Sequence, residues 1–394
     1  MIFQTLDDKT ECVGVYADGE LHFEKYPDKL TQTWKYTGVF PAADIDYANL
    51  YCDGKTLAQV CPPAIEERLT KAQRRLKAYQ QSFQIAKINL RNHCIFDLVP
   101  HDFLKEFCDI KNQITNHVLT TYDRPLVYEH LRDVTKLLYK IKFQNLNLSA
   151  EHCQELFYNT PSRVMAKKLL DGPRHIDYNL FGTITGRLTT QPLSFPILTS
   201  QRGFRKLLKP SNDWFLSLDY NGAEVRTLLG MSEEEQPQVD IHNWNVKNLF
   251  EDFITREEAK TIFFGWLYNP DSTAIETDVY NRQKVLDTYY DGEYVTTPFL
   301  RRIKVQQSRA LNYLIQSTTA DLVLDRAVAI DNFLEGKRSF VSHIVHDEIV
   351  MDMVDEEREF IPVIRDIFAK NKIGTYLVNL SAGKNYLDLK YLNL

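Results

Sequence analysis

The sequence predicts a mixed α/β protein of the α+β type, in which an antiparallel sheet is combined with helical subdomains. Three observations carry this prediction. Residues 214–219 form an apolar run with the pattern of a buried strand. Residues 339–354 have the pattern of a β-hairpin. Residues 64–89 are rich in Lys, Arg and Gln with widely spaced apolar positions, which is typical of a long, partly exposed helix.

Length and composition narrow the class of protein. A chain of 394 residues is too long for one ordinary core, so two or three subdomains are expected. Hydrophobic residues make up 44% and charged residues 25% of the chain, which excludes disordered and collagen-like classes. The chain has no apolar run of about 18 residues and no signal-peptide pattern. We therefore expect a cytoplasmic protein without a membrane partner.

Charge and cysteine usage add two expectations. The net charge is −6, yet basic residues gather between residues 74 and 91 and between residues 202 and 209. Such clusters either hold a polyanion or form solvated helix faces. The six cysteines include no Cys-x-x-Cys pair, so they are expected to be reduced thiols.

The first half of the chain predicts a β-rich start followed by helices. Residues 1–51 show short alternating patterns with turn glycines, which indicate a small β-rich segment. Pro62 and Pro63 then start the long helix of residues 64–89. Further helical patterns follow at residues 101–108, 125–141 and 150–170. Together these helices predict an elongated helical subdomain.

The second half of the chain predicts the sheet. Residues 176–190 have strand composition with glycine interruptions, and they precede the strand that ends at Asp219. The later patterns are helical at 232–271, a hairpin at 339–354, a helix at 356–370 and a strand at 375–380. The acidic pair Asp347 and Glu348 is expected to form the turn of the hairpin.

Two carboxylates at the ends of predicted core strands are the first candidate site. Alone, Asp219 fits an ordinary solvated turn, because Asp prefers the surface. Asp347 at the end of a second strand changes that interpretation, since two carboxylates with substrate phosphates complete a site for Mg²⁺. Two such ions can assist an in-line displacement at phosphorus.

A row of side chains on one predicted helix is the second candidate site. Arg256, Lys260, Phe264 and Tyr268 are spaced four apart and therefore lie along one face. Two cations can hold a triphosphate, and two aromatic rings can stack on a sugar or a base. An ordinary surface helix would place cations and aromatics on opposite faces.

Two amides on a later helix are the third candidate. Asn312 and Gln316 share a face of an otherwise apolar helix. Amides can meet the acceptors of a DNA minor groove without reading its sequence. Amides satisfied inside the core remain an equal alternative.

Taken in order, these segments resemble the family A DNA polymerases, the family of bacterial DNA polymerase I and of many phage replicases. Residues 219–226 resemble motif A, with Gly222 as in the phage branch. Residues 256–268 resemble motif B and residues 346–348 resemble motif C. Smaller matches lie in the expected order at residues 185–188, 240–242, 301–302 and 383–386. The resemblance covers about residues 62–394.

The resemblance implies roles for individual residues in catalysis and nucleotide binding. Asp219 and Asp347 would be catalytic and hold two Mg²⁺ ions, for which Mn²⁺ would be a substitute, with the Tyr220 carbonyl as a further ligand. Lys260 would be catalytic as well as a nucleotide ligand. The residues implied in binding the incoming deoxynucleotide are Arg256, Lys260 and His242 at the triphosphate, Phe264 at the sugar, Tyr268 at the template base and Glu224 where a 2′-hydroxyl would lie.

The resemblance also implies DNA contacts and a domain layout. The residues implied at the primer-template are Arg187, Asn312 and Gln316 in the minor groove and His346 and Glu348 near the primer end. The fold implied is a right hand with an antiparallel palm sheet, a helical thumb and helical fingers. Its parts would be a small β-rich segment at 1–61, a thumb at 62–171, a palm at 172–231 and 320–394, and fingers at 232–319. Departures from the family pattern fall at Phe263, at Asn269 and at residues 193–198.

The implied function is template-directed DNA polymerisation, with a role in replication or repair. The segment before residue 62 is too short for the family's exonuclease domain, so no 3′–5′ proofreading is expected. The implied partners are primer-template DNA, deoxynucleotides and a separate exonuclease, helicase or processivity subunit. If the chain is encoded by a phage, the host cytoplasm would be its location.

Two rival functions stay open. A single-subunit RNA polymerase shares this organisation, although Glu224 and Glu348 favour DNA synthesis. A catalytically inactive, nucleic-acid-binding replication subunit would have lost Asp219 or Asp347, and both are present.

Overall fold

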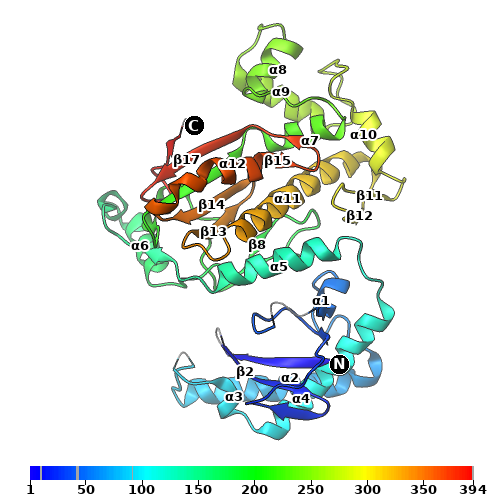
Figure 1. The fold of residues 1–394 in the computed structure, drawn as a ribbon, viewed down its shortest axis with the longest axis vertical. Helices are drawn as coiled ribbons and strands as arrows, with labels where there is room; N and C mark the ends of the chain where they lie inside the picture. The colour runs from blue at the N-terminus through cyan, green and yellow to red at the C-terminus, as the bar shows by residue number, and fades with distance from the viewer. Residues whose placement is uncertain (9–10, 41–43, 91, 393–394) are drawn as a thin grey trace. The chain divides into compact units, whose positions relative to one another are not determined.

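The protein is described by a computed structural model, which covers residues 1–8, 11–40, 44–90 and 92–392. The chain folds into two compact units, Met1–Lys136 and Leu137–Leu394 (Figure 1). The four-part layout expected from the sequence stays a prediction. All six cysteines are free thiols, as predicted. In the described part of the chain, no helix is long and apolar enough to cross a membrane.

The N-terminal unit joins a small sheet to two long helices. Its antiparallel sheet has the order β1-β2-β3, formed by β1 (Phe3–Asp8), β2 (Glu11–Ala17) and β3 (Glu20–His22). Its main helices are α2 (Pro63–Ile85) and α4 (His101–Thr121). The shorter elements are β4 (Gln32–Thr33), β5 (Asp46–Tyr47), α1 (Ala48–Tyr51) and α3 (Ile95–Leu98). Helix α2 begins at a proline, which suits a first helical position because the missing N–H has no partner there anyway.

Helices α2 and α4 of this unit pack through their apolar faces. Leu69 and Ala72 of α2 share a buried cluster with Phe103 and Ile110 of α4. On the exposed side, Arg75 pairs with Glu106 at 2.6 Å. Helix α2 ends at Ile85, four residues earlier than expected.

The C-terminal unit is built on a five-stranded antiparallel sheet of order β13-β14-β10-β17-β18. Its strands are β10 (Trp214–Tyr220), β13 (Phe340–Val345), β14 (Glu348–Met353), β17 (Val378–Gly383) and β18 (Lys390–Tyr391). Helices α11 (Gln307–Phe333) and α12 (Ile361–Ala369) pack together and against the sheet (Figure 1). The fold therefore has an α/β architecture with an antiparallel sheet, as predicted.

The position of β10 at the centre of the sheet explains its apolar sequence. Phe215, Leu216 and Leu218 are almost completely buried, because neighbouring strands and helices cover the sheet. Asp219 is paired in register with Glu348 on one side and with Asn379 on the other. The sheet thus brings three polar side chains together at one end of an otherwise apolar core.

A group of helices in the same unit packs against α11, at the upper and right side of Figure 1. These helices are α8 (Ile241–Leu249), α9 (Arg256–Tyr268) and α10 (Arg282–Tyr289). Thr255 starts α9 with a capping box, in which its side chain and that of Glu258 satisfy each other's backbone N–H groups. Phe263, Trp266 and Tyr280 hold the group together in a buried aromatic cluster.

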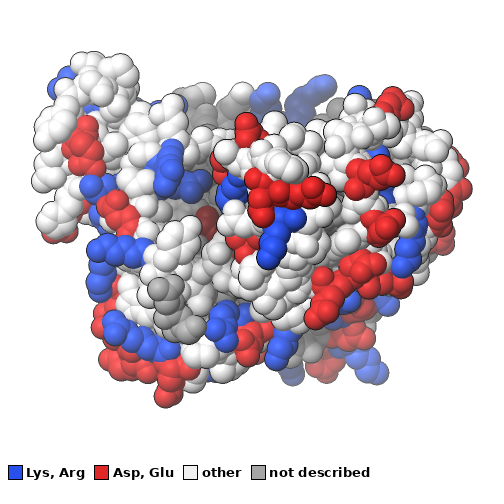
Figure 2. All heavy atoms as spheres, turned by 90° about the horizontal axis from the view of Figure 1, so that it is seen from above, with Lys and Arg blue, Asp and Glu red and all other residues white. Residues whose placement is uncertain are grey.

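The remaining elements of this unit are short. They are β6 (Asn147–Leu148), the 3₁₀ helix η1 (Gln154–Phe157), α6 (Thr160–Leu170), β7 (Tyr178–Asn179), β8 (Thr189–Thr190), η2 (Arg202–Leu207), β9 (Leu208–Lys209), α7 (Ala223–Met231), β11 (Tyr294–Thr296), β12 (Arg302–Lys304), η3 (Asp355–Phe360), β15 (Lys370–Asn371) and β16 (Gly374–Thr375). Helix α5 (Tyr128–Lys142) contains the boundary between the units. On the face seen in Figure 2, acidic and basic side chains are interspersed.

Four further sequence predictions need correction. Residues 176–190 form only the two-residue strands β7 and β8, because turns fill most of the segment. The helix expected at 150–170 begins at Thr160, where Pro161 fits the first turn. The hairpin turn consists of His346 and Asp347, since Glu348 already belongs to β14. The last predicted strand begins at Val378 instead of residue 375.

Candidate active site

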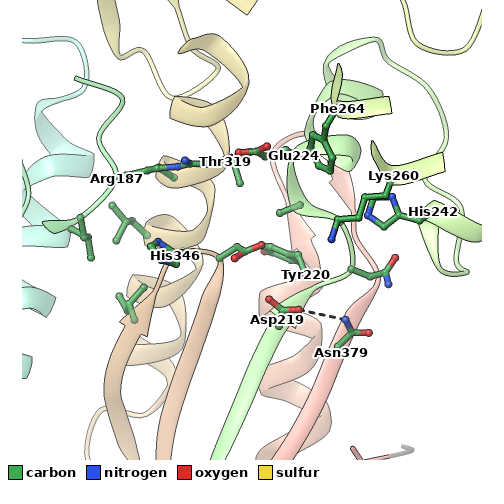
Figure 3. Close-up of a pocket in the computed structure, with 18 of the residues that line it drawn as sticks. Arg187, Asp219, Tyr220, Glu224, His242, Lys260, Phe264, Thr319, His346 and Asn379 are labelled. Carbon is green, nitrogen blue, oxygen red and sulfur yellow. Dashed lines mark hydrogen bonds and ion pairs between the residues drawn. The ribbon is translucent and has the colours of Figure 1, made fainter. Parts of the chain in front are cut away.

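One cavity of about 540 Å³ in the C-terminal unit gathers most of the residues singled out in the sequence. Ten of them line it: Arg187, Asp219, Tyr220, Glu224, His242, Arg256, Lys260, Phe264, His346 and Asp347. Figure 3 shows Asp219 at the end of its strand, with Lys260 and His242 reaching toward the same space from α9 and α8. Four more predicted residues, Tyr268, Asn312, Gln316 and Glu348, do not line this cavity.

The acidic end of the cavity is formed by β10 and the β13–β14 turn. The pKa of Asp219 is raised to about 7, first by burial and then by the nearby Asp347 carboxylate, while the hydrogen bond from Asn379 opposes the shift. The Asn379 amide donates to Asp219 at a long 3.5 Å (Figure 3). His346, the other turn residue, has a φ of 58°. The tight turn therefore holds Asp347 close to Asp219.

This acidic end fits divalent cations. The Asp347 carboxylate disfavours the ionised form of Asp219, and a cation between the two would relieve this repulsion. In the described ranges, no group of three or more His, Cys, Asp or Glu side chains is placed to hold a metal ion. A Mg²⁺ site of one or two carboxylates does not need such a group, because water and substrate phosphates complete it.

Glu348 has a different environment from the two aspartates. Ser217 donates to one of its carboxylate oxygens at 2.5 Å, and Tyr386 donates to the other at 2.6 Å. Both oxygens are therefore engaged by hydroxyl groups. Burial raises the pKa of Tyr386, and Glu348 raises it further, so the phenol stays a donor.

The basic side of the cavity comes from α9. Arg256 donates to Asp240 through Nε at 3.1 Å and through Nη2 at 2.9 Å, and its Nη1 reaches Glu257 at 2.7 Å. Burial opposes ionisation of Asp240, but hydrogen bonds from Arg256 and Asn221 lower its pKa well below the usual range. Lys260 is exposed to the cavity.

His242 lies beside these cations and is 4% exposed. Burial lowers its pKa to about 4, and the positive charges of Arg256 and Lys260 contribute. Its Nδ1 atom is buried without a hydrogen-bond partner among the described residues. A neutral imidazole with a buried, unpartnered nitrogen suits a polar ligand in the cavity.

Three charged or polar side chains meet at Glu224, which also lines the cavity. The Glu224 carboxylate accepts from Arg187 and from the Tyr268 hydroxyl. Burial and Glu224 both raise the pKa of Tyr268, while a hydrogen bond with Gln316 opposes them. Phe264 stacks on Tyr268 with ring centroids 6.0 Å apart. Gln316 is thus connected to Glu224 through Tyr268. The buried Oδ1 of Asn312 has no hydrogen-bond partner within the described structure.

The sequence analysis did not predict the buried side chain that holds the backbone next to the site. Arg226 is completely buried and donates to the carbonyls of Asn221, Pro237 and Val239 at 2.6, 2.7 and 2.7 Å. A charged residue in the apolar helix α7 was the available signal, because a buried guanidinium needs several acceptors. Burial lowers the pKa of Arg226 to about 10. Ser217, Asn379 and Tyr386 were also missed as partners of the acidic end.

This fold resembles that of a polymerase domain among the solved structures. The chain resembles the polymerase domain of Pol1 from M. smegmatis, solved with a DNA primer-template and dNTP. The TM-score is 0.52, and the match covers 73% of this chain and 76% of that chain at 17% sequence identity. The predicted fold is confirmed by this similarity.

Sequence relatives point to one group of polymerases. The chain is 26% identical to DNA polymerase I of Synechocystis sp. over 288 residues, 55% of this chain and 29% of the relative. It is 27% identical to the thermostable DNA polymerase I of Thermus aquaticus over 241 residues, 48% of this chain and 29% of that protein. It is 24% identical to DNA polymerase I of Pseudomonas aeruginosa over 239 residues, 47% of this chain and 26% of that protein.

The chain thus spans less than a third of the length of these curated relatives. No protein-family model matches it. The resemblance to family A polymerases stated from the sequence is confirmed by relatives of the DNA polymerase I type.

Proposed function

We propose that this chain is a template-directed DNA polymerase that adds deoxynucleotides to the 3′ end of a primer. The observation that carries the proposal is that Asp219, Asp347 and the cations of α9 line one cavity. Phosphoryl transfer asks a protein mainly for positioning and for neutralisation of charge, and this cavity has groups for both.

Asp219, Asp347 and the Tyr220 carbonyl would hold two divalent ions, Mg²⁺ with Mn²⁺ as a substitute. When bound, such ions neutralise phosphate charge and activate the attacking hydroxyl. We do not assign Glu348 to metal binding, because both of its carboxylate oxygens accept hydrogen bonds from Ser217 and Tyr386.

The cations of the cavity differ in how they are paired. Arg187 is paired with Glu224, and Arg256 is paired with Asp240. Lys260, the third Lys or Arg side chain that lines the cavity, forms no ion pair with another described residue. Of these three cations, Lys260 is therefore the one whose positive charge is not offset by a paired carboxylate and is available to a triphosphate. In this proposal Arg256 and His242 bind the same triphosphate.

In this proposal, other side chains in and beside the cavity bind the nucleoside and the DNA. Phe264 would pack on the sugar, and Glu224 would occupy the space of a ribose 2′-hydroxyl. Tyr268 would lie at the template base. The side chains proposed at the primer-template are Arg187, Asn312, Gln316, His346 and Glu348.

Primer extension tests this function. Asp219→Ala and Asp347→Ala should each lower extension by roughly a hundredfold to a thousandfold, because charge stabilisation by the ions is worth several kcal/mol. Binding to primer-template, measured by fluorescence anisotropy, should persist and weaken with salt. Asp366→Ala, an exposed carboxylate on α12, is the matched control and should extend normally.

Two outcomes contradict the proposal. Wild-type rates from Asp219→Ala would refute the metal role of this carboxylate. A wild-type protein that binds primer-template but does not extend it would favour the inactive replication subunit.

Several finer statements stay proposals. We place the activity in DNA replication or repair in the cytoplasm, with a separate exonuclease, helicase or processivity subunit as partners. The lack of 3′–5′ proofreading in this chain stays a prediction. Metal-dependent loss of 3′ nucleotides from a labelled primer would show it to be wrong.

A further inference from the structure

We propose that Asn221 and Asp240 are positioning residues that fix the plane of the Arg256 guanidinium and join it to the strand carrying Asp219. This inference rests on the proposed function, because it assigns Arg256 to the triphosphate of an incoming nucleotide. The three side chains form one connected set inside the C-terminal unit: Asn221 Nδ2 donates to Asp240, and Asp240 accepts from Arg256.

Asp240 is held by four hydrogen bonds. Oδ1 accepts from Arg256 Nε at 3.1 Å and from the Asn243 backbone N–H at 2.9 Å. Oδ2 accepts from Arg256 Nη2 at 2.9 Å and from Asn221 Nδ2 at 2.8 Å. The bond from Asn243 caps the start of α8. Because both oxygens have two donors, rotation of the carboxylate would break several bonds at once.

Asn221 connects this carboxylate to the acidic end of the cavity. It follows Asp219 by two residues and is 8% exposed. Its Oδ1 accepts from the Ile241 backbone N–H at 2.8 Å while its Nδ2 donates to Asp240. The amide donates through one atom and accepts through the other, whereas an ionised carboxylate here would have no donor and would face Asp240 with like charge.

Beneath Asn221, the buried Arg226 prevents the connection from shifting. Its Nε donates to the Asn221 carbonyl at 2.6 Å, and its two terminal nitrogens reach the carbonyls of Pro237 and Val239, just before Asp240. Both ends of the Asn221–Asp240 bond are thus tied to one completely buried side chain.

The geometry assigns Arg256 an orienting role. A bidentate pair fixes the direction of a planar guanidinium, which a single contact does not. The side chains of Arg256 and Asp240 are 39% and 26% exposed, so water screens their attraction and direction matters more than pairing strength. Glu257 also contacts Arg256, but its side chain is 76% exposed and held by no second residue in the described structure.

A double-mutant cycle tests the proposal. Asp240→Ser keeps a residue able to cap α8 but cannot pair with both Arg256 nitrogens. We expect it to weaken dNTP binding to the complex with a chain-terminated primer-template by roughly tenfold, a size typical of directly coupled residues. In an Arg256→Ala background the same substitution should have little effect. Asn221→Ala should behave in the same way, and its effect should not add to that of Asp240→Ser.

The control is Glu257→Gln, which removes the other carboxylate at Arg256 and should leave dNTP binding within about twofold of wild type. Equal losses from Asp240→Ser in both backgrounds would overturn the proposal, since Asp240 would then act only on the fold of α8. An unchanged affinity in Asp240→Ser would overturn it as well.

Failure of this inference can be told apart from failure of the proposed function, because the readout is binding and not extension. A wild-type protein that binds dNTP without extending primers refutes polymerase activity, while the cycle still decides on Asp240. A wild-type protein that does not bind dNTP overturns both.

Discussion

Replacing Gly222 by alanine is a sharp test of how the site is assembled. Gly222 has a φ of +70°, in the left-handed region that residues with a Cβ atom avoid. A Cβ atom there would lie 2.4 Å from Cγ2 of Ile241 and 3.4 Å from Nε2 of His242. The backbone cost is about 1–2 kcal/mol, and the overpacking of a buried methyl adds about 1–3 kcal/mol. Gly222→Ala should therefore destabilise the C-terminal unit by roughly 2–5 kcal/mol.

Thermal unfolding measures this change. The midpoint of the C-terminal unit should fall by roughly 4–20 °C, given about 2–4 °C for each kcal/mol in a unit of this size. Gly265→Ala is the control with the opposite sign. A methyl group added there would meet no atom within 4 Å, and alanine in a helix is favoured over glycine by about 0.5–1 kcal/mol.

A second variant separates the two causes. Ile241→Ala removes the Cγ2 atom that the new methyl would meet, so the steric part of the Gly222→Ala penalty should disappear in that background. The backbone part should remain. An unchanged midpoint in Gly222→Ala would refute the reasoning, as would a penalty that is the same with and without Ile241.

Three further predictions follow from the same cavity and the sheet below it. Glu224→Ala frees Tyr268 and Arg187 and should raise ribonucleotide incorporation relative to deoxynucleotides by roughly tenfold or more; a wild-type enzyme that already prefers ribonucleotides would contradict the assignment. Phe264→Tyr should raise termination by dideoxynucleotides, and an unchanged termination pattern would argue against its place at the sugar. His343 is fully buried, and burial, with Arg205 nearby, lowers its pKa from 6.5 to about 3. The folded protein favours neutral His343, whereas the unfolded chain takes up a proton below pH 6.5. The free energy of unfolding is therefore unaffected by this group above pH 6.5 and falls by about 1.4 kcal/mol per pH unit as the pH falls toward 3. His343→Phe should move acid unfolding to lower pH, and an unshifted midpoint would count against this cause.

The sequence predicted those parts of the fold whose signals are local. Strand β10 was evident because an apolar run of this length has few alternatives, and the hairpin around Asp347 alternates clearly. The row from Arg256 to Phe264 was predicted from spacing alone, and these side chains do line one cavity.

The remaining features depend on partners that are distant in sequence. Glu224 and Tyr268 are 44 residues apart, and no local pattern tells that the phenol donates to this carboxylate. The pairing of Arg256 with Asp240 is likewise set by the packing of α8 against α9. The prediction of strands for residues 176–190 was wrong because residues that favour β-structure lie there mostly in turns. Gly186 in one of these turns has a φ of 75°.

The two-residue turn that contains Asp347 limits where residues can be inserted into this chain. Val345 and Glu348 pair directly, so only His346 and Asp347 connect the two strands. Side chains alternate between the faces of a strand, and one inserted residue would therefore turn the carboxylate away from Asp219 or shift the register of β14. Insertion libraries should tolerate added residues at the exposed Gly292, where an added methyl group would have open space around it, and reject them at this hairpin.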